Sequence, residues 1–132
     1  MRSAVIYYSQ TGNTKRIARA VQEGLVRATG SCDLIDLPEA YPRLVRDYDL
    51  IGIGCPVWEF KEPGNVRIFL EALPQLPGKH SFLFATHGPG RGSVFASMGK
   101  VLAQREVRIV GYRSWYGQVW TQGTPSPYFT DG

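Results

Sequence analysis

Hydrophobic residues change their spacing several times along the chain, and each change marks a predicted element. Residues 3–8 are rich in Val, Ile and Tyr and stop at a polar turn, which is typical of a strand. Residues 14–28 instead place apolar side chains at every fourth position from Ile17 to Leu25, among basic and polar residues. That spacing predicts an amphipathic helix, which ends near Gly30.

The rest of the chain repeats this alternation. Further strands are predicted at residues 32–37, which read as an edge strand, and at residues 49–55, 81–85 and 107–115. Helices are predicted as a short segment within residues 39–46 that Pro42 breaks, from an Asn65 cap to Pro74, and from a Ser93 cap through Leu102. Strict alternation predicts an α/β fold with a parallel sheet, right-handed crossovers and helices on both faces.

Composition and charge limit the number of domains, the cellular compartment and the partners that we expect. The 132 residues fit one domain, and a hydrophobic content of 43% is enough for a core at that length. No apolar run approaches the roughly 20 residues of a membrane helix, and the N-terminus lacks the pattern of a signal peptide, so we expect a soluble cytoplasmic protein. The net charge of +4 is scattered, which favours acidic partners without indicating nucleic acid or membrane binding.

Ligands of such sheets bind outside the carboxyl ends of the strands, so the loops after Tyr8, Cys55 and Ala85 are the candidate site. The first loop joins a strand directly to a helix. Its backbone N–H groups and hydroxyls therefore converge on the positive end of the helix dipole, which predicts an anion site.

The residue types of this loop indicate which anion it binds. Neither the GxxxxGK[ST] nor the GxGxxG spacing is present, which excludes a Walker loop and a dinucleotide fingerprint. Neutral hydroxyl and amide groups suit a phosphate dianion held without a lysine. The alternative is that Asn13 or Thr14 only caps the helix and Gly12 only makes the turn.

Three strings at these loops carry a resemblance to the flavodoxin family. Residues 8–14 (YSQTGNT) closely resemble the FMN phosphate loop of flavodoxins, which follows the first strand. Residues 54–58 (GCPVW) resemble the family's G-[ST]-P-x-[YW] loop, whose aromatic residue lies on the flavin ring, and residues 86–92 (THGPGRG) occupy the position of the other flavin-contacting loop. The resemblance spans residues 3 to about 117 and implies a flavodoxin-like, doubly wound five-stranded parallel sheet of order 2-1-3-4-5.

The resemblance implies that FMN is the cofactor and assigns a role to each loop. The phosphate would be bonded by the side chains of Ser9, Thr11, Asn13 and Thr14 and by the amides of Gln10, Gly12 and Asn13. The ring would be bordered by Pro56, Val57 and Trp58. Its pyrimidine edge would meet backbone donors of the segment that comprises Thr86, His87, Gly88, Pro89 and Gly90. For each residue taken singly, an ordinary structural role in a loop is the alternative.

The chain departs from the family pattern at two of these loops. The third loop holds no aromatic residue except His87, so one flavin face is open unless residues just past the last strand cover it. Those residues are Trp115, Tyr116 and Trp120. Glu59 and Phe60 stand where many flavodoxins have a glycine whose peptide flips, so strong stabilisation of the neutral semiquinone is not expected.

A histidine and two cysteines leave alternatives open. His87 either titrates at the ring edge and couples protonation to reduction, or is a hydrogen-bonded loop histidine. Cys55 stands where the family more often has Ser or Thr, and its thiol either fills space or is redox-active beside the flavin. Cys32 is expected to be structural, and the two cysteines lack the spacing of a metal site or a disulfide framework.

The C-terminal end predicts an unusual feature. Residues 118–132 show no helical period, so we expect an irregular tail after an FMN-binding domain at residues 1–117. A complete flavodoxin-like fold ends with a helix after the fifth strand, and that last helix is absent from this chain. Either the natural protein continues past Gly132, or another subunit buries the uncovered apolar face, and we expect a homo-oligomer formed through that face.

The leading functional hypothesis is an FMN electron carrier, or the flavin module of a larger redox system, with an iron–sulfur or flavin protein as its redox partner. One alternative is an FMN-dependent NAD(P)H:quinone or flavin reductase, whose relatives usually carry inserts for the nicotinamide that this chain lacks. The other is a flavodoxin-shaped binding module without a cofactor, against which the intact phosphate loop argues. Cys-x5-Arg is missing, which excludes a tyrosine phosphatase, and the acids of a receiver domain are missing as well.

Overall fold

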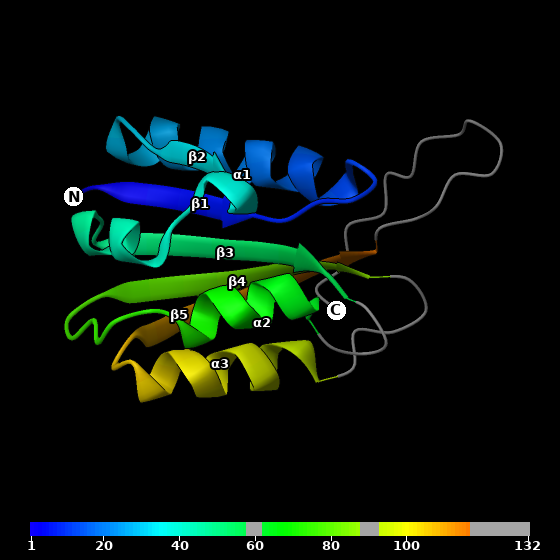
Figure 1. Ribbon diagram of the computed structural model, residues 1–132. Coiled ribbons are helices and arrows are strands. Elements are labelled where there is room, and N and C mark those ends of the chain that lie inside the picture. The colour runs from blue at the N-terminus through cyan, green and yellow to red at the C-terminus, as the bar shows by residue number, and fades with distance from the viewer. Residues whose placement is uncertain (58–61, 88–92, 117–132) are drawn as a thin grey trace, which may run out of the picture.

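A computed structural model describes residues 1–57, 62–87 and 93–116 (Figure 1). The strands are β1 (Ser3–Tyr7), β2 (Asp33–Asp36), β3 (Leu50–Pro56), β4 (His80–His87) and β5 (Arg108–Tyr116). The helices are α1 (Asn13–Thr29), α2 (Gly64–Glu71) and α3 (Val94–Gln104), and two 3-10 segments, η1 (Leu37–Glu39) and η2 (Pro42–Asp47), follow β2. Each strand and long helix predicted from the hydrophobic pattern is present.

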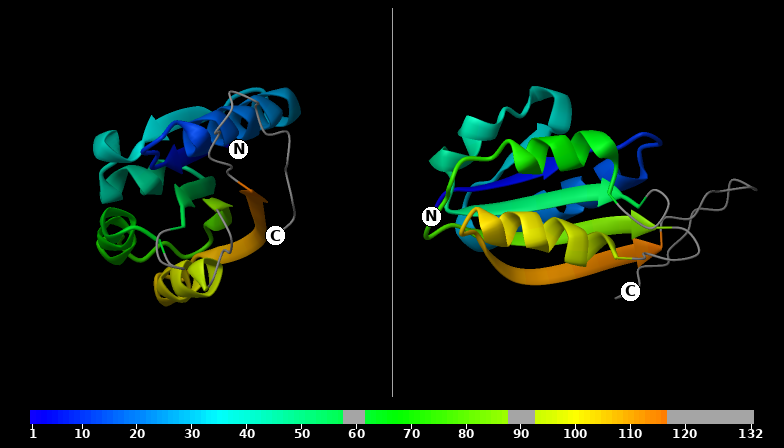
Figure 2. Two further views of the ribbon diagram at one scale, coloured as in Figure 1. Left: turned by 90° about the vertical axis from the view of Figure 1, so that its right-hand side faces the viewer. Right: turned by 60° about the horizontal axis from the view of Figure 1, so that its bottom comes forward.

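All neighbouring strands pair in parallel, and the sheet order is β2-β1-β3-β4-β5. Helix α1 lies on one face of the sheet, and α2 and α3 lie side by side on the other (Figures 1 and 2). The prediction of a doubly wound, five-stranded parallel sheet of order 2-1-3-4-5 is therefore confirmed. Within the described ranges, no helix has the length and apolar character needed to cross a bilayer.

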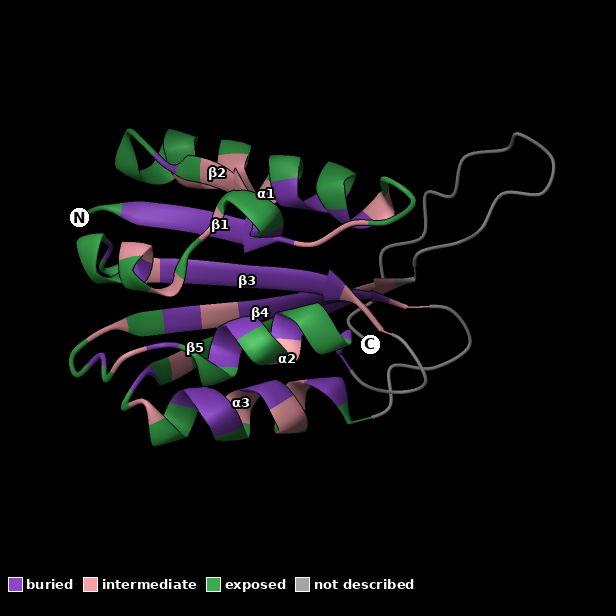
Figure 3. Ribbon diagram, viewed as in Figure 1, coloured by how far each residue is buried: buried purple, intermediate pink, exposed green. Residues whose placement is uncertain are grey.

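The core has one layer on each side of the sheet. In β1, Ala4 and Ile6 face α2 and α3, whereas Val5 and Tyr7 face α1. Strands β1 and β3 are consequently buried on both faces (Figure 3), as expected for central strands of a parallel sheet. The larger layer, towards α2 and α3, carries most of the apolar contacts that hold β3 and β4 in place.

Two glycines in β3 let the neighbouring strand pack closely. An added Cβ at Gly52 would lie 2.2 Å from Cζ of Phe82, and one at Gly54 would lie 2.0 Å from Cε2 of Phe84. The two phenylalanine rings, whose centroids are 6.2 Å apart, therefore lie over the backbone of β3 on the α1 face. Glycine inside a strand often marks such a close approach.

The start of one helix differs from the prediction. Helix α2 begins at Gly64 after an N-cap at Pro63, and the side chain of Asn65 accepts a hydrogen bond from the N–H of Val66 at 2.9 Å instead of capping the helix. Ser93 occupies the N-cap position of α3, but its side chain makes no capping hydrogen bond. The predicted cap of α2 is wrong because it was assigned from residue type, whereas the position of the α3 cap at Ser93 is confirmed. The expected tail at residues 118–132, the absent last helix and Trp120 lie outside the described residues.

Candidate functional site

The three loops singled out in the sequence leave the sheet at one edge. Strands β1, β3 and β4 are neighbours and parallel, so their carboxyl ends meet there (Figure 1). The structure brings Ser9, Gln10, Thr11, Gly12, Asn13 and Thr14 to this edge together with Pro56, Val57, Thr86 and His87. Trp58, Gly88, Pro89 and Gly90 lie outside the described residues.

The first loop turns sharply into α1 at Gly12, the N-cap, which has a left-handed φ of 94°. Its N–H donates to Oγ of Ser9 at 3.0 Å, and the helix begins with the bond from the N–H of Arg16 to the carbonyl of Gly12 at 3.0 Å. The amides of Asn13, Thr14 and Lys15 thus have no acceptor within the helix. Because the first turn also lacks an acidic residue, this largely exposed loop has the electropositive character of a candidate anion site.

Asn13 and Thr14 are held differently from each other. Oδ1 of Asn13 accepts a hydrogen bond from Nη2 of Arg16 at 2.7 Å, which places a guanidinium beside the loop. Thr14 is only 2% exposed, and its Oγ1 lies 2.7 Å from Oγ1 of Thr86 on β4. The Thr14 hydroxyl is therefore bonded inside the fold and not displayed on the loop with Thr11, a distinction that the residue types did not indicate.

Backbone hydrogen bonds fix the position at which the loop after β3 starts. The N–H of Val57 donates to the carbonyl of Thr86 at 2.9 Å, and the N–H of Tyr8 donates to the carbonyl of Gly54 at 3.0 Å. The first bond continues the β3–β4 pairing by one residue, and the second continues the β1–β3 pairing by one residue. As a result, the starts of the first and second loops are held in register with β4.

Cys55 lies beneath this loop and is fully buried. Its Sγ lies 3.8 Å from Sδ of Met98 on α3. Burial, and then the neighbouring Glu62 carboxylate, raise the pKa of the Cys55 thiol to about 12. A neutral, enclosed thiol favours the space-filling role over the redox-active one, because the thiolate is the reactive form. Cys32 is buried as well, consistent with the structural role expected for it.

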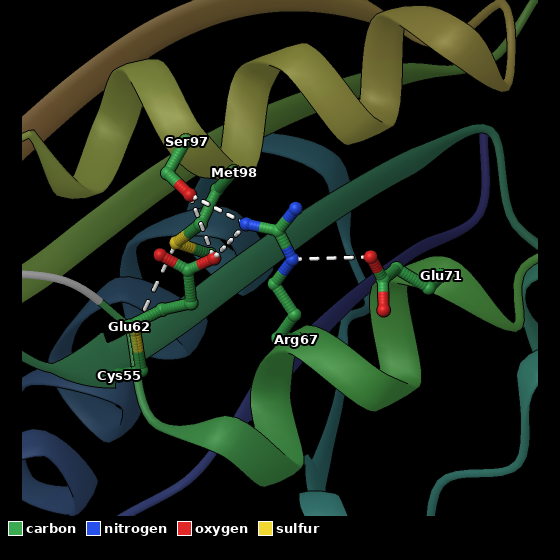
Figure 4. A network of polar contacts seen from close by, with 6 residues as sticks. All are labelled: Cys55, Glu62, Arg67, Glu71, Ser97 and Met98. Atoms are coloured by element: carbon green, nitrogen blue, oxygen red, sulfur yellow. Dashed lines mark hydrogen bonds and ion pairs between the residues drawn. The ribbon is translucent and has the colours of Figure 1, made fainter.

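Glu62 belongs to a polar network that the sequence analysis missed (Figure 4). Its side chain is fully buried, and Oε2 accepts hydrogen bonds from Oγ of Ser97 at 2.9 Å and from Nη1 of Arg67 at 3.3 Å. The same Arg67 nitrogen donates to Oγ of Ser97 at 2.9 Å, and Nε donates to Oε2 of Glu71 at 3.1 Å. Glu62 is the first described residue after the second loop, so this network ties the end of that loop to α2 and α3.

Trp115, near the carboxyl end of β5, lies on the α1 side of the sheet. Trp115 is half-buried, pairs in register with Thr86 and meets the Phe84 ring edge-on at 6.3 Å between centroids. The Arg113 guanidinium lies 5.6 Å from the centre of the Trp115 ring. Trp115 therefore packs on the sheet, and whether it also covers a flavin stays a prediction. His87, half-buried, ends β4 at the same edge.

A doubly wound sheet with a candidate anion site after β1 and two more loops at the same edge is typical of proteins that bind a phosphate-bearing cofactor. Residues 4–131 match the family model of the flavodoxin domain, so the chain belongs to the flavodoxin family. It is accordingly an FMN-binding flavoprotein of electron transfer, as the sequence resemblance implied.

Individual relatives agree with this assignment. The flavodoxin of Clostridium beijerinckii is 25% identical over 111 residues, which cover 82% of this chain and 75% of that protein. The solution structure of two-electron reduced Megasphaera elsdenii flavodoxin has the same fold, with a TM-score of 0.77 and 24% identity over 85% of this chain and 84% of that one. Rubredoxin oxygen:oxidoreductase from Desulfovibrio gigas shares the fold with a TM-score of 0.75 and 14% identity, over 96% of this chain and 31% of that chain.

Proposed function

We propose that this chain holds FMN at the carboxyl edge of β1, β3 and β4 and exchanges electrons there with a protein partner. The observation that carries the proposal is the geometry of the first loop. Gly12 in the left-handed region turns the chain so that the first amides of α1 point outward from an exposed loop, and an added Cβ there would meet nothing within 4 Å. Such a nest has the size and the positive potential that a phosphate group needs.

Each group of the site would have a defined task. The phosphate would be held by the hydroxyls of Ser9 and Thr11, by the Asn13 side chain and by the loop amides. The ring would lie between the loop that Pro56 and Val57 begin and the loop that follows His87. FMN supplies reversible redox chemistry when bound, while the protein supplies binding, orientation and the local charge.

The charges around the loop support an acidic redox partner. Lys15, Arg16 and Arg19 are exposed on the first turns of α1, beside the proposed phosphate site. Long-range attraction between such a basic surface and an acidic one raises the rate of encounter. An iron–sulfur or flavin protein with an acidic face is therefore the partner we propose, either as a separate protein or as another part of a longer chain.

We further propose that two copies associate through the sheet face on the α1 side of β4 and β5. Helix α1 contacts β3 and β4. On the α1 side of β5, Figure 2 shows no helix among the described residues, and the half-buried Phe82 and Trp115 lie at this part of the face. A cytoplasmic location is also proposed. It is supported by the two cysteines, which are buried thiols, the state that a reducing compartment maintains.

The phosphate assignment predicts that Thr11→Val weakens FMN binding about tenfold, because a good hydrogen bond to a charged group is lost. Riboflavin, which has no phosphate, should bind equally well to Thr11→Val and to the original protein. Binding would be measured by titrating each flavin with protein and following flavin fluorescence and the visible absorption bands.

Thr29→Val is the matched control, because Thr29 lies at the other end of α1 and its hydroxyl bonds only local carbonyl groups, those of Leu25 and Ser31. This control should leave the affinity for both flavins unchanged. Equal weakening of FMN and riboflavin by Thr11→Val would contradict a phosphate contact at Thr11. Failure of the original protein to retain FMN would contradict the proposed site as a whole.

A further inference from the structure

Thr86 is the point at which the three loops of the site are joined. It lies near the carboxyl end of β4, between β3 and β5, and is 5% exposed. Its hydroxyl oxygen lies 2.7 Å from that of Thr14 in the first turn of α1. Its carbonyl accepts the N–H of Val57 at 2.9 Å, at the start of the loop after β3. One residue therefore contacts both other loops and is followed by the third.

The pair of hydroxyls is a side-chain hydrogen bond that links α1 directly to β4. Both residues are buried, so neither hydroxyl can replace the other with bulk water. A buried hydroxyl that loses its partner costs more free energy than the bond itself contributes. The pair thus fixes the rotamers of Thr14 and Thr86 and seats the first turn of α1 on β4.

The hydroxyl pair can also affect a hydrogen bond to a third group beyond Thr14 and Thr86. Either oxygen can be the donor of this bond. A hydroxyl donates one hydrogen bond and accepts others, so when Thr86 donates, Thr14 keeps its own proton for another acceptor. Hydrogen bonds in such a chain strengthen one another in a low-dielectric interior. Through the Thr14 hydroxyl, Thr86 therefore influences how a ligand is bonded at the first turn of α1.

We propose that Thr86 is a positioning residue for the phosphate subsite: its hydroxyl orients Thr14 and holds the phosphate loop in register with the loops around the flavin ring. The inference rests on the proposed FMN site. It differs from the role implied by the family resemblance, in which Thr86 serves as a backbone donor to the flavin. It also changes the role of Thr14 from a free loop hydroxyl to a member of a buried pair.

The test compares four single variants and one double variant by their affinity for FMN and for riboflavin. Thr86→Val removes the hydroxyl with little change in shape, Thr86→Ser keeps it, and Thr14→Val removes the other half of the pair. Ser81→Ala is the matched control, because Ser81 is a buried hydroxyl at the opposite end of β4 that donates to the carbonyl of Ile51 at 2.7 Å. Thermal unfolding of each variant would be recorded alongside.

Thr86→Val should weaken FMN binding about tenfold and riboflavin binding less than about twofold, so that the ratio of the two affinities falls. Thr86→Ser should restore that ratio. Ser81→Ala should lower the unfolding temperature without changing the ratio. The double variant T14V/T86V removes both hydroxyls of the pair, so neither is left buried without its partner, and it provides a folded comparison. Its affinity ratio should be lowered at least as far.

The results that would contradict the role of Thr86 can be told apart from one another. An unchanged ratio in Thr86→Val, with the ratio lowered in Thr14→Val, would make Thr14 a direct phosphate ligand and overturn the role of Thr86. Equal weakening of both flavins by Thr86→Val would reduce Thr86 to a structural residue. If the original protein bound no FMN, the proposed site itself would fail, and that result is separable because it precedes any comparison of variants.

Discussion

At the scale of single residues, the most perturbed thiol in the molecule lies directly under the site. Cys55 is enclosed between β3 and α3, and its pKa is about 12, compared with an ordinary value of 9.0. The thiol is therefore neutral at any pH at which an electron carrier works. Because the charged form is excluded from the interior, the native state requires the protonated thiol.

This requirement predicts how stability depends on pH. A folded pKa above the unfolded value contributes stability that is fully present below about pH 9 and is lost as the pH rises toward about 12. We expect the free energy of unfolding to fall over this range, and to fall less in Cys55→Ala, which has no thiol to ionise. Urea denaturation near pH 8 and pH 11 would measure both slopes. Parallel losses in the two proteins would contradict the burial of a neutral thiol at Cys55.

At the scale of elements, the contact between β3 and β4 depends on two positions without a side chain. Gly54→Ala would place a Cβ within 2.1 Å of Cζ of Phe84, which is 1% exposed and has no space to move into. Overpacking of this kind costs up to about 3 kcal/mol of unfolding free energy. Gly52→Ala should cost about 1 kcal/mol or less, because Phe82 is half-buried and its ring can turn outward.

Urea unfolding of both variants would test this difference, and they are matched because they lie on the same face of the same strand. An equal cost for both would mean that the exposure of the ring does not control the strain. A variant that combines Gly54→Ala with Phe84→Leu should recover part of the loss, since the smaller side chain vacates the space.

At the scale of the whole molecule, the exposed part of the sheet on the α1 side predicts self-association. Gly111 pairs in register with Phe82, and an added Cβ at Gly111 meets nothing within 4 Å. Gly111→Glu therefore places a charge in the middle of this face without strain in the monomer. We expect a dimer that dissociates on dilution, and a monomer for Gly111→Glu at all concentrations, by sedimentation velocity.

Gly24→Glu is the control, because Gly24 lies on α1 and also has open space around its Cα. It carries the same charge change and should associate as the original protein does. A monomer at every concentration for the original protein would show that this face is covered within the chain.

The alternation of strands and helices, and the place of the phosphate loop between β1 and α1, were determined by the sequence alone. These features depend on neighbouring residues: a spacing of two or four apolar positions, a glycine at a turn, a Pro that ends a helix. Local pattern is sufficient there because each element buries its own apolar face.

Only the tertiary structure decided how the site is held together. Thr14 and Thr86 are 72 residues apart, and Ser97 and Glu62 are 35 apart, so no spacing along the chain indicates either pair. Glycines inside a strand, such as Gly52 and Gly54, indicate a close approach, but they do not indicate the rings of Phe82 and Phe84 that lie over them. A polar side chain becomes a partner only when folding removes water from around it, and which partner it meets depends on how the strands and helices pack.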